Sequence, residues 1–104
     1  MKIYFVYIIY CSDESYYIGV TNNIRRRFQE HRSGYNPTSY TAQRLPLKLV
    51  YYEVFKNVIE AIQREKQLKG WSRIKKEALI ENRPNRLKIL SKKKFRERRP
   101  SIQK

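Results

Sequence analysis

The stretch YYIGVTNNIRRRFQEHRSG, residues 16–34, decides the fold, because it joins a strand directly to a helix. Its first five residues are aromatic, β-branched or glycine and are typical of a strand. Thr21 is a suitable N-cap for a helix of about ten residues. Gly34 is expected just beyond its end, because glycine readily adopts the left-handed conformation that closes helices. The stretch therefore predicts a strand, a turn and a helix in succession.

The segments before and after this stretch predict the rest of a sheet. Residues 3–11 (IYFVYIIYC) are dense in aromatic and β-branched side chains and predict a strand. Residues 12–15 (SDES) have turn chemistry, so this strand and residues 16–20 should form a hairpin. Residues 35–45 predict an irregular loop, and residues 47–55 (LKLVYYEVF) predict a third strand.

The second half of the chain predicts two helices. Asn57 and Glu60 match a capping box, with Asn in place of Ser or Thr, and the helix that begins there should end near Gly70. A short third helix should follow Trp71 and Ser72 and run to about Glu81. The expected fold is α/β of the α+β type: a small three-stranded antiparallel sheet flanked by helices.

Composition points to a polyanionic partner. The 104 residues include 24 Lys or Arg against 9 Asp or Glu, a formal net charge of +15. The last 22 residues hold ten of these cations and one acid, so we divide the chain into a domain, 1–82, and a basic C-terminal tail, 83–104. A nucleic-acid partner explains such a charge, because each phosphate that a cation neutralises releases condensed counterions. The chain has no long apolar run, which argues against a membrane partner. The single cysteine, Cys11, allows no intrachain disulfide, and a cytoplasmic location is expected.

The helix within residues 21–34 carries three consecutive arginines that face different ways. With Ile24 at 0°, Arg27 falls at about −60° and His31 at about −20°, beside the apolar stripe. Arg25 and Arg26 fall at about 100° and 200°, on the water side. Arg27 and His31 are thus neighbours. Either they belong to a functional site, or Arg27 extends to solvent at the edge of the core and His31 is a hydrogen-bonded interface residue.

The helix that follows Asn57 contains an unusual carboxylate. With Val58 at 0° and Ile62 at about +40°, Glu65 lies at about −20°, in the middle of the expected buried stripe. Glu60 and Arg64 are expected to project away from that stripe. A buried carboxylate must be paired, protonated or bound to a cation. Its partner is either an arginine of this basic chain or a divalent metal.

Nine tyrosines are many for a chain of this length. Most of them, such as Tyr51 and Tyr52, are expected to fill a half-buried sheet. A tyrosine can also accept a proton, but its ordinary pKa near 10 makes that useful only beside a positive charge. Arg27 or a metal ion could supply that charge.

These residues together resemble a known family. Residues 6–8 (VYI), residues 16–19 (YYIG), Arg27, His31 and a glutamate on a later helix resemble the GIY-YIG nuclease superfamily. That superfamily includes homing endonucleases, restriction enzymes and the N-terminal nuclease domain of the bacterial excinuclease. The stretches YYIGVTNNIRRRFQEHRSG and EAIQREKQLKGWSRIKKEALIE are similar to a group of small stand-alone bacterial members. The resemblance covers roughly residues 3–82.

The resemblance implies a set of catalytic and binding residues. It assigns catalysis to the tyrosines of the two motifs, the arginine and histidine of the first long helix and the glutamate, namely Tyr7, Tyr17, Arg27, His31 and Glu65. Gly19 would let backbone and substrate come close, and Arg25 and Arg26 would also contact nucleic acid. Phe5 departs from the pattern, since it occupies the place of the first motif's glycine. The late asparagine of the family could be Asn82 or Asn85.

The implied activity is hydrolysis of phosphodiester bonds by a metal-dependent endonuclease of repair or recombination type. Glu65 would hold one Mg²⁺ or Mn²⁺, and DNA is the favoured substrate over RNA. The alternative is a non-catalytic DNA- or RNA-binding module, and a structural ribosomal protein would explain the charge but not Glu65. Because the chain has no separate recognition domain, a partner protein could direct it to its substrate. The sequence leaves the oligomeric state open.

Overall fold

The computed structural model describes residues 2–82. The chain forms two compact units, one ending at Gly70 and one beginning at Trp71. The basic tail expected over residues 83–104, and Asn85 within it, lie outside the described residues.

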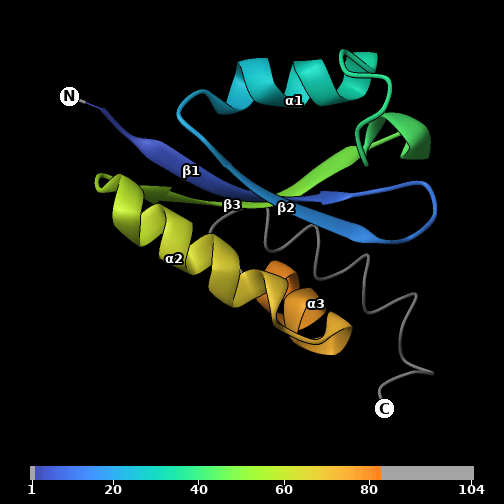
Figure 1. The fold of residues 1–104 in the computed structure, drawn as a ribbon. Coiled ribbons are helices and arrows are strands. Elements are labelled where there is room, and N and C mark those ends of the chain that lie inside the picture. Colours follow the sequence, from blue (N-terminus) through green and yellow to red (C-terminus); the bar gives the residue numbers. More distant parts are fainter. Residues whose placement is uncertain (1, 83–104) are drawn as a thin grey trace. The chain divides into compact units, whose positions relative to one another are not determined.

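A three-stranded antiparallel sheet forms the centre of the first unit. Strand β1 (Tyr4–Tyr10) lies between β2 (Tyr16–Thr21) and β3 (Lys48–Phe55), in the order β2-β1-β3 (Figure 1). Tyr7 pairs with Gly19 on one side and Tyr52 on the other. A register shift between Ile8 and Ile9 bends the β1–β3 ladder. The expected sheet, flanked by helices, is confirmed.

Each face of the sheet carries one helix, α1 (Ile24–Ser33) or α2 (Val58–Lys69) (Figure 1). Because side chains alternate along a strand, Tyr7, Ile9 and Cys11 share one face, where Ile24 and Phe28 of α1 pack on them. The neighbouring positions of the strands face the other way, and α2 contacts all three strands there. Buried side chains on that side are Val6, Ile8, Ile18, Ala61 and Leu68.

Helix α1 begins two residues later than the sequence indicated. Thr21 was expected as the N-cap, but it is the last residue of β2, and its Oγ1 accepts a hydrogen bond from the Asn23 backbone N–H at 3.1 Å. Asn23 is the N-cap, and its side chain accepts from the Arg26 N–H at 3.0 Å. The Thr21 hydroxyl bonds locally to form the turn, which leaves capping to Asn23. The end at Gly34 is confirmed, with φ of 70°.

Helix α2 is rotated about its axis relative to the expected orientation. Its buried residues are Ala61 and Leu68, whereas Val58 and Ile62 are exposed. The expectation that Arg64 projects away from the sheet is wrong. Its side chain is only 23% exposed, and its Nε and NH2 donate to the two carboxylate oxygens of Glu53 on β3 at 2.9 Å each. This fork holds α2 against the sheet.

The remaining elements are short. Within the stretch expected to be an irregular loop, Ala42–Arg44 form one turn of 3-10 helix, η1. The second unit contains α3 (Arg73–Glu81), which Ser72 caps by accepting from the Lys75 N–H at 3.2 Å. The expected helix following Ser72 is thereby confirmed.

Candidate active site

The site is built around Tyr7, whose side chain lies across Gly19 of the neighbouring strand. A β-carbon added to Gly19 would stand 2.4 Å from the Tyr7 hydroxyl oxygen and 2.6 Å from its Cζ. Real Cβ atoms do not approach other atoms so closely. Tyr7 is buried, so it cannot move aside into solvent. Gly19 is therefore required by the packing of Tyr7 itself, before any contact with a substrate is considered.

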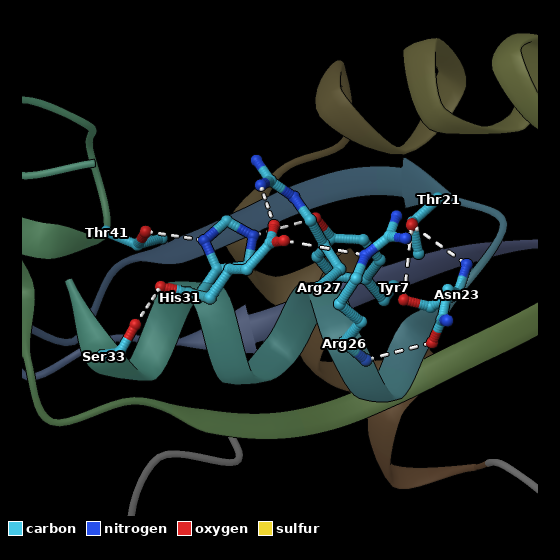
Figure 2. A network of polar contacts seen from close by, with 9 residues as sticks. Tyr7, Thr21, Asn23, Arg26, Arg27, His31, Ser33 and Thr41 are labelled. Carbon is cyan, nitrogen blue, oxygen red and sulfur yellow. Dashed lines mark hydrogen bonds and ion pairs between the residues drawn. The ribbon is translucent and has the colours of Figure 1, made fainter. Parts of the chain in front are cut away.

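A buried chain of polar groups runs from Tyr7 through His31 to Thr41 (Figure 2). The Tyr7 hydroxyl is 3.0 Å from Nε2 of His31, and Nδ1 of His31 is 2.7 Å from Oγ1 of Thr41. Each of the three comes from a different element: β1, α1 and the residue before η1. Both imidazole nitrogens therefore have partners, which fixes the ring in place.

Burial changes the acid–base properties of this chain. Burial and the positive charge of Arg27 together lower the pKa of His31 to about 4, against the opposing effect of Glu30. The imidazole is thus neutral at pH 7, with one nitrogen donating and the other accepting. Burial, with a contribution from Tyr17, raises the pKa of Tyr7 to about 12, while Arg27 acts in the opposite direction. The phenol is therefore protonated at pH 7.

Tyr17 of β2 lies beside both members of this pair. Its ring centroid is 5.2 Å from that of His31 and 6.4 Å from that of Tyr7. Unlike Tyr7, it is only partly covered, so it connects the buried groups with the surface. The two tyrosines singled out from the sequence thus meet at one imidazole.

The three consecutive arginines of α1 separate as helical geometry predicts. Arg25 and Arg26 are exposed, whereas Arg27 is partly covered and close enough to Tyr7 to affect its pKa. Glu30 accepts from NH1 of Arg27 at 2.9 Å and lies 3.6 Å from Nε of Arg26. Glu30 thereby holds the Arg27 guanidinium beside the phenol.

Glu65 approaches the same group of residues from α2. Its side chain is 16% exposed, and its negative charge contributes to the raised pKa of Tyr7. The cation beside it is a lysine rather than an arginine. Nζ of Lys69, one turn further along α2, lies 2.8 Å from Oε2 of Glu65. Among residues 2–82 no group of three or more His, Cys, Asp or Glu side chains could hold a metal ion.

The structure therefore brings Tyr7, Tyr17, Arg27, His31 and Glu65 into one neighbourhood, with Gly19 beneath Tyr7. Asn82, one of the two asparagines considered, is the C-cap of α3 in the second unit. Sequence reasoning missed Glu30, Thr41 and Lys69. The i,i+3 spacing of Arg27 and Glu30 and the i,i+4 spacing of Glu65 and Lys69 could have revealed two of them. Thr41 comes from a loop without periodicity, so no local signal marks it.

No helix in the described part of the chain has the length and apolar character needed to cross a membrane.

Comparison with known proteins identifies the family. Residues 3–78 match the model of the GIY-YIG catalytic domain. The chain is 43% identical to a UPF0213 protein of Syntrophus aciditrophicus over 83 residues, which are 80% of this chain and 95% of that protein. It is 42% identical to a UPF0213 protein of the archaeal species Haloquadratum walsbyi over 78 residues, 75% of this chain and 86% of the relative.

A solved structure has the same fold. The solution NMR structure of a UPF0213 protein from Bacillus halodurans superposes with a TM-score of 0.55 at 36% sequence identity, covering 86% of this chain and 95% of that one. The chain therefore belongs to the GIY-YIG family of nuclease-type domains that act on nucleic acid.

Proposed function

We propose that this chain is a metal-dependent endonuclease that hydrolyses phosphodiester bonds, with DNA favoured over RNA, in repair or recombination. The observation that carries the proposal is the buried Tyr7–His31–Thr41 chain, with Arg27 and Glu65 beside its phenolic end. A domain that only binds nucleic acid has no need for a neutral imidazole hydrogen-bonded to a buried phenol. A cytoplasmic location belongs to the same proposal.

Glu65 is the residue that would hold the metal. Its Oε2 already has a cation at 2.8 Å, the ammonium of Lys69, so the carboxylate is placed to receive positive charge. A single hard oxygen ligand suits Mg²⁺ or Mn²⁺, which retain several waters and take phosphate oxygens as further ligands. The donor set fits such a site. When bound, the metal would supply Lewis-acid stabilisation of charge on the phosphate.

The tyrosine and the histidine would move one proton. Because the pKa of Tyr7 is about 12, the phenolate is too scarce at pH 7 to act as a free base. In the proposed path the Tyr7 hydroxyl donates to Nε2 of His31 and Nδ1–H of His31 donates to Thr41. As a water attacks phosphorus, its proton passes to the Tyr7 oxygen while the phenolic proton passes to Nε2. The P–O bond to the leaving nucleoside oxygen breaks, and that oxygen takes up a proton from solvent. His31 is neutral at pH 7, so Nε2 has a lone pair for this proton, and its lowered pKa of about 4 means that the imidazolium would be transient and would return the proton once the reaction is complete.

Arg27 and Tyr17 would act on the phosphate. The guanidinium of Arg27 lies near the phenolic oxygen where the attacking water would be deprotonated, and Glu30 fixes its direction. A donor held in place in this way stabilises charge that develops in the transition state, an effect worth several kcal/mol in comparable sites. Tyr17, at the border between the buried groups and solvent, would orient the water or the phosphate.

Two exposed arginines and the basic tail would add affinity without sequence preference. Arg25 and Arg26 face solvent on the helix that carries Arg27. Phosphate contacts of this kind release counterions, so the binding constant should fall steeply with salt. A binding constant that does not change between low and high salt would contradict this part of the proposal.

The decisive experiment is a cleavage assay on labelled duplex, branched and single-stranded DNA and RNA with Mg²⁺ or Mn²⁺. Wild type is compared with Glu65→Gln and with Glu60→Gln, which removes an exposed carboxylate from the same helix. Cutting should require metal, persist in Glu60→Gln and disappear in Glu65→Gln while binding remains. Tyr7→Phe should lower the rate about 10²–10⁴-fold. Full metal-dependent cutting by Glu65→Gln would refute the assignment.

A further inference from the structure

Beside the candidate active site lies an aromatic side chain that the proposed chemistry does not use. Tyr40 directly precedes Thr41 along the chain, and the two residues have opposite surroundings. Thr41 is buried against His31, whereas Tyr40 is 41% exposed. The Tyr40 ring stacks with that of Tyr17, with centroids 5.9 Å apart and planes at 26°. Tyr40 is therefore fixed one residue from the buried polar chain, with much of its surface in solvent.

Arg44 is stacked on Tyr40 and is held in that position. Its Cζ lies 3.7 Å above the centre of the Tyr40 ring. Nε of Arg44 donates to Oδ2 of Asp13 at 2.9 Å, and NH1 donates to the Tyr40 carbonyl oxygen at 2.8 Å. These bonds fix the plane of a long side chain, so binding a ligand on it does not carry the entropic cost of ordering that side chain.

The Tyr40 hydroxyl is fixed as well. It donates to Oγ of Ser15 at 2.7 Å, and Ser15 donates in turn to Asp13 at 2.6 Å. The turn between β1 and β2 thus holds both the ring and the guanidinium. A device that only fastened the loop would gain most by burying the ring, because buried apolar surface is what stabilises a fold. Here the ring is held in one orientation and left partly in water.

We propose that the Arg44 guanidinium, which lies flat on the Tyr40 ring, offers its outer face as a stacking surface for an unpaired nucleobase next to the phosphodiester bound at Tyr7, Tyr17 and Arg27. The proposal rests on the proposed function, and it specifies the substrate class as nucleic acid with an unpaired nucleotide. Aromatic rings and guanidinium planes are the two kinds of side chain on which unpaired bases stack. A base inside a duplex has no free face to offer, so the surface selects ends, flaps or single strands.

The test measures stacking without cleavage. Oligonucleotides carrying 2-aminopurine, whose fluorescence falls when it stacks, are titrated with the full-length protein in EDTA. The panel holds single-stranded DNA, single-stranded RNA of matching sequence, a DNA flap and a blunt DNA duplex. Wild type should quench the unpaired probe and bind unpaired DNA more tightly than the duplex. Tyr40→Leu, which keeps an apolar side chain but removes the ring, should lose the quenching and bind the unpaired probe about tenfold more weakly.

Two further variants make the outcome specific. Tyr35→Leu removes a tyrosine of the same loop that is 74% exposed, and it should behave like wild type. Arg44→Lys keeps the charge but loses the planar group, and it decides the question if Tyr40→Leu fails to fold. It should reduce quenching and affinity for unpaired probes more than for the duplex. If the variants lose quenching and affinity on both single-stranded DNA and single-stranded RNA, the surface recognises the base alone. If the loss is confined to DNA or to RNA, that polymer is the substrate.

Failure of this inference is distinguishable from failure of the proposed function. Wild-type quenching and affinity in both Tyr40→Leu and Arg44→Lys would overturn the stacking surface, whatever the cleavage assay shows. Absence of metal-dependent cutting by wild type on every substrate would overturn the nuclease, even where the stacking results hold.

Discussion

The titration of His31 tests the buried polar chain most directly, because this is the only histidine among the 104 residues. Burial and the charge of Arg27 lower its pKa to about 4 in the folded protein. In the unfolded chain its pKa is close to 6.5. As pH falls, the unfolded chain therefore takes up the proton first. The stability contributed by neutral His31 is complete above about pH 6.5 and is lost as the pH falls toward 4.

The size of the effect follows from this difference in pKa. Integrating proton uptake for one group with these two pKa values gives a loss of about 2.5 kcal/mol between about pH 8 and pH 4.5. That is a large part of the 5–15 kcal/mol typical of a domain. Most of this window lies above pH 4, near which the unfolded chain begins to protonate Asp13 and Glu53, the carboxylates whose folded pKa values are lowered. Their protonation therefore matters mainly at lower pH.

Two measurements check the prediction. The imidazole resonances of the one histidine, followed by NMR, report its folded pKa without ambiguity. Urea denaturation across the same pH range gives the free energy of unfolding for wild type and for His31→Gln. Wild type should lose about 2.5 kcal/mol over the window, whereas His31→Gln should change little. An imidazole that titrates near 6.5, or equal slopes for the two proteins, would refute the buried, neutral histidine.

Three further predictions concern the packing of Tyr7, the hydrogen bond between Thr41 and His31, and the fork between Arg64 and Glu53. Gly19→Ala should displace Tyr7, lower the free energy of unfolding by about 1–3 kcal/mol and abolish cutting. Gly70→Ala is the control and should be tolerated, because its added Cβ would meet nothing closer than 3.6 Å. Urea denaturation and the cleavage assay compare the two variants. Thr41→Val removes the hydroxyl next to Nδ1 of His31 and should lower the free energy of unfolding by about 1–3 kcal/mol. Thr38→Val, at an exposed position, should lower it far less, and equal losses of stability would contradict the buried hydrogen bond. Arg64→Gln leaves the Glu53 carboxylate without the guanidinium that it accepts from, so the pKa of Glu53 should rise. The free energy of unfolding should fall by about 1–2 kcal/mol at pH 7 and by less at pH 4, with Arg25→Gln as the exposed control. A loss of stability that is independent of pH would argue against the ion pair.

Local signals were sufficient for the elements of this fold. Dense aromatic and β-branched residues produced the strands, and Asn57, Gly34 and Gly70 marked helix ends where they were expected. The start of α1 was placed two residues early, at Thr21, because two nearby side chains can both cap. Which of them caps depends on where strand pairing stops, and Thr21 still pairs with Phe5 of β1.

The orientation of α2 could not be read from its own residues. Val58 and Ile62 suggested a buried stripe, yet the buried positions Ala61 and Leu68 are centred about 70° away from Val58. Small Ala61 allows the helix to approach the sheet closely, and the Arg64–Glu53 fork stabilises that rotation. Glu53 lies on β3, eleven positions away from Arg64 along the chain, so helical periodicity carries no information about it.

The shift in orientation changes what Glu65 can do. Measured from the buried centre of α2, Glu65 and Arg64 lie about 50° to either side, so they flank the stripe rather than fill it. Arg64 turns toward β3 and anchors the helix, while Glu65 on the opposite flank is close enough to Tyr7 to contribute to its raised pKa. A carboxylate at the centre of the stripe would be sealed under the helix. At the flank it is covered yet still reached by the exposed Lys69, whose ammonium the metal of the proposed function would replace.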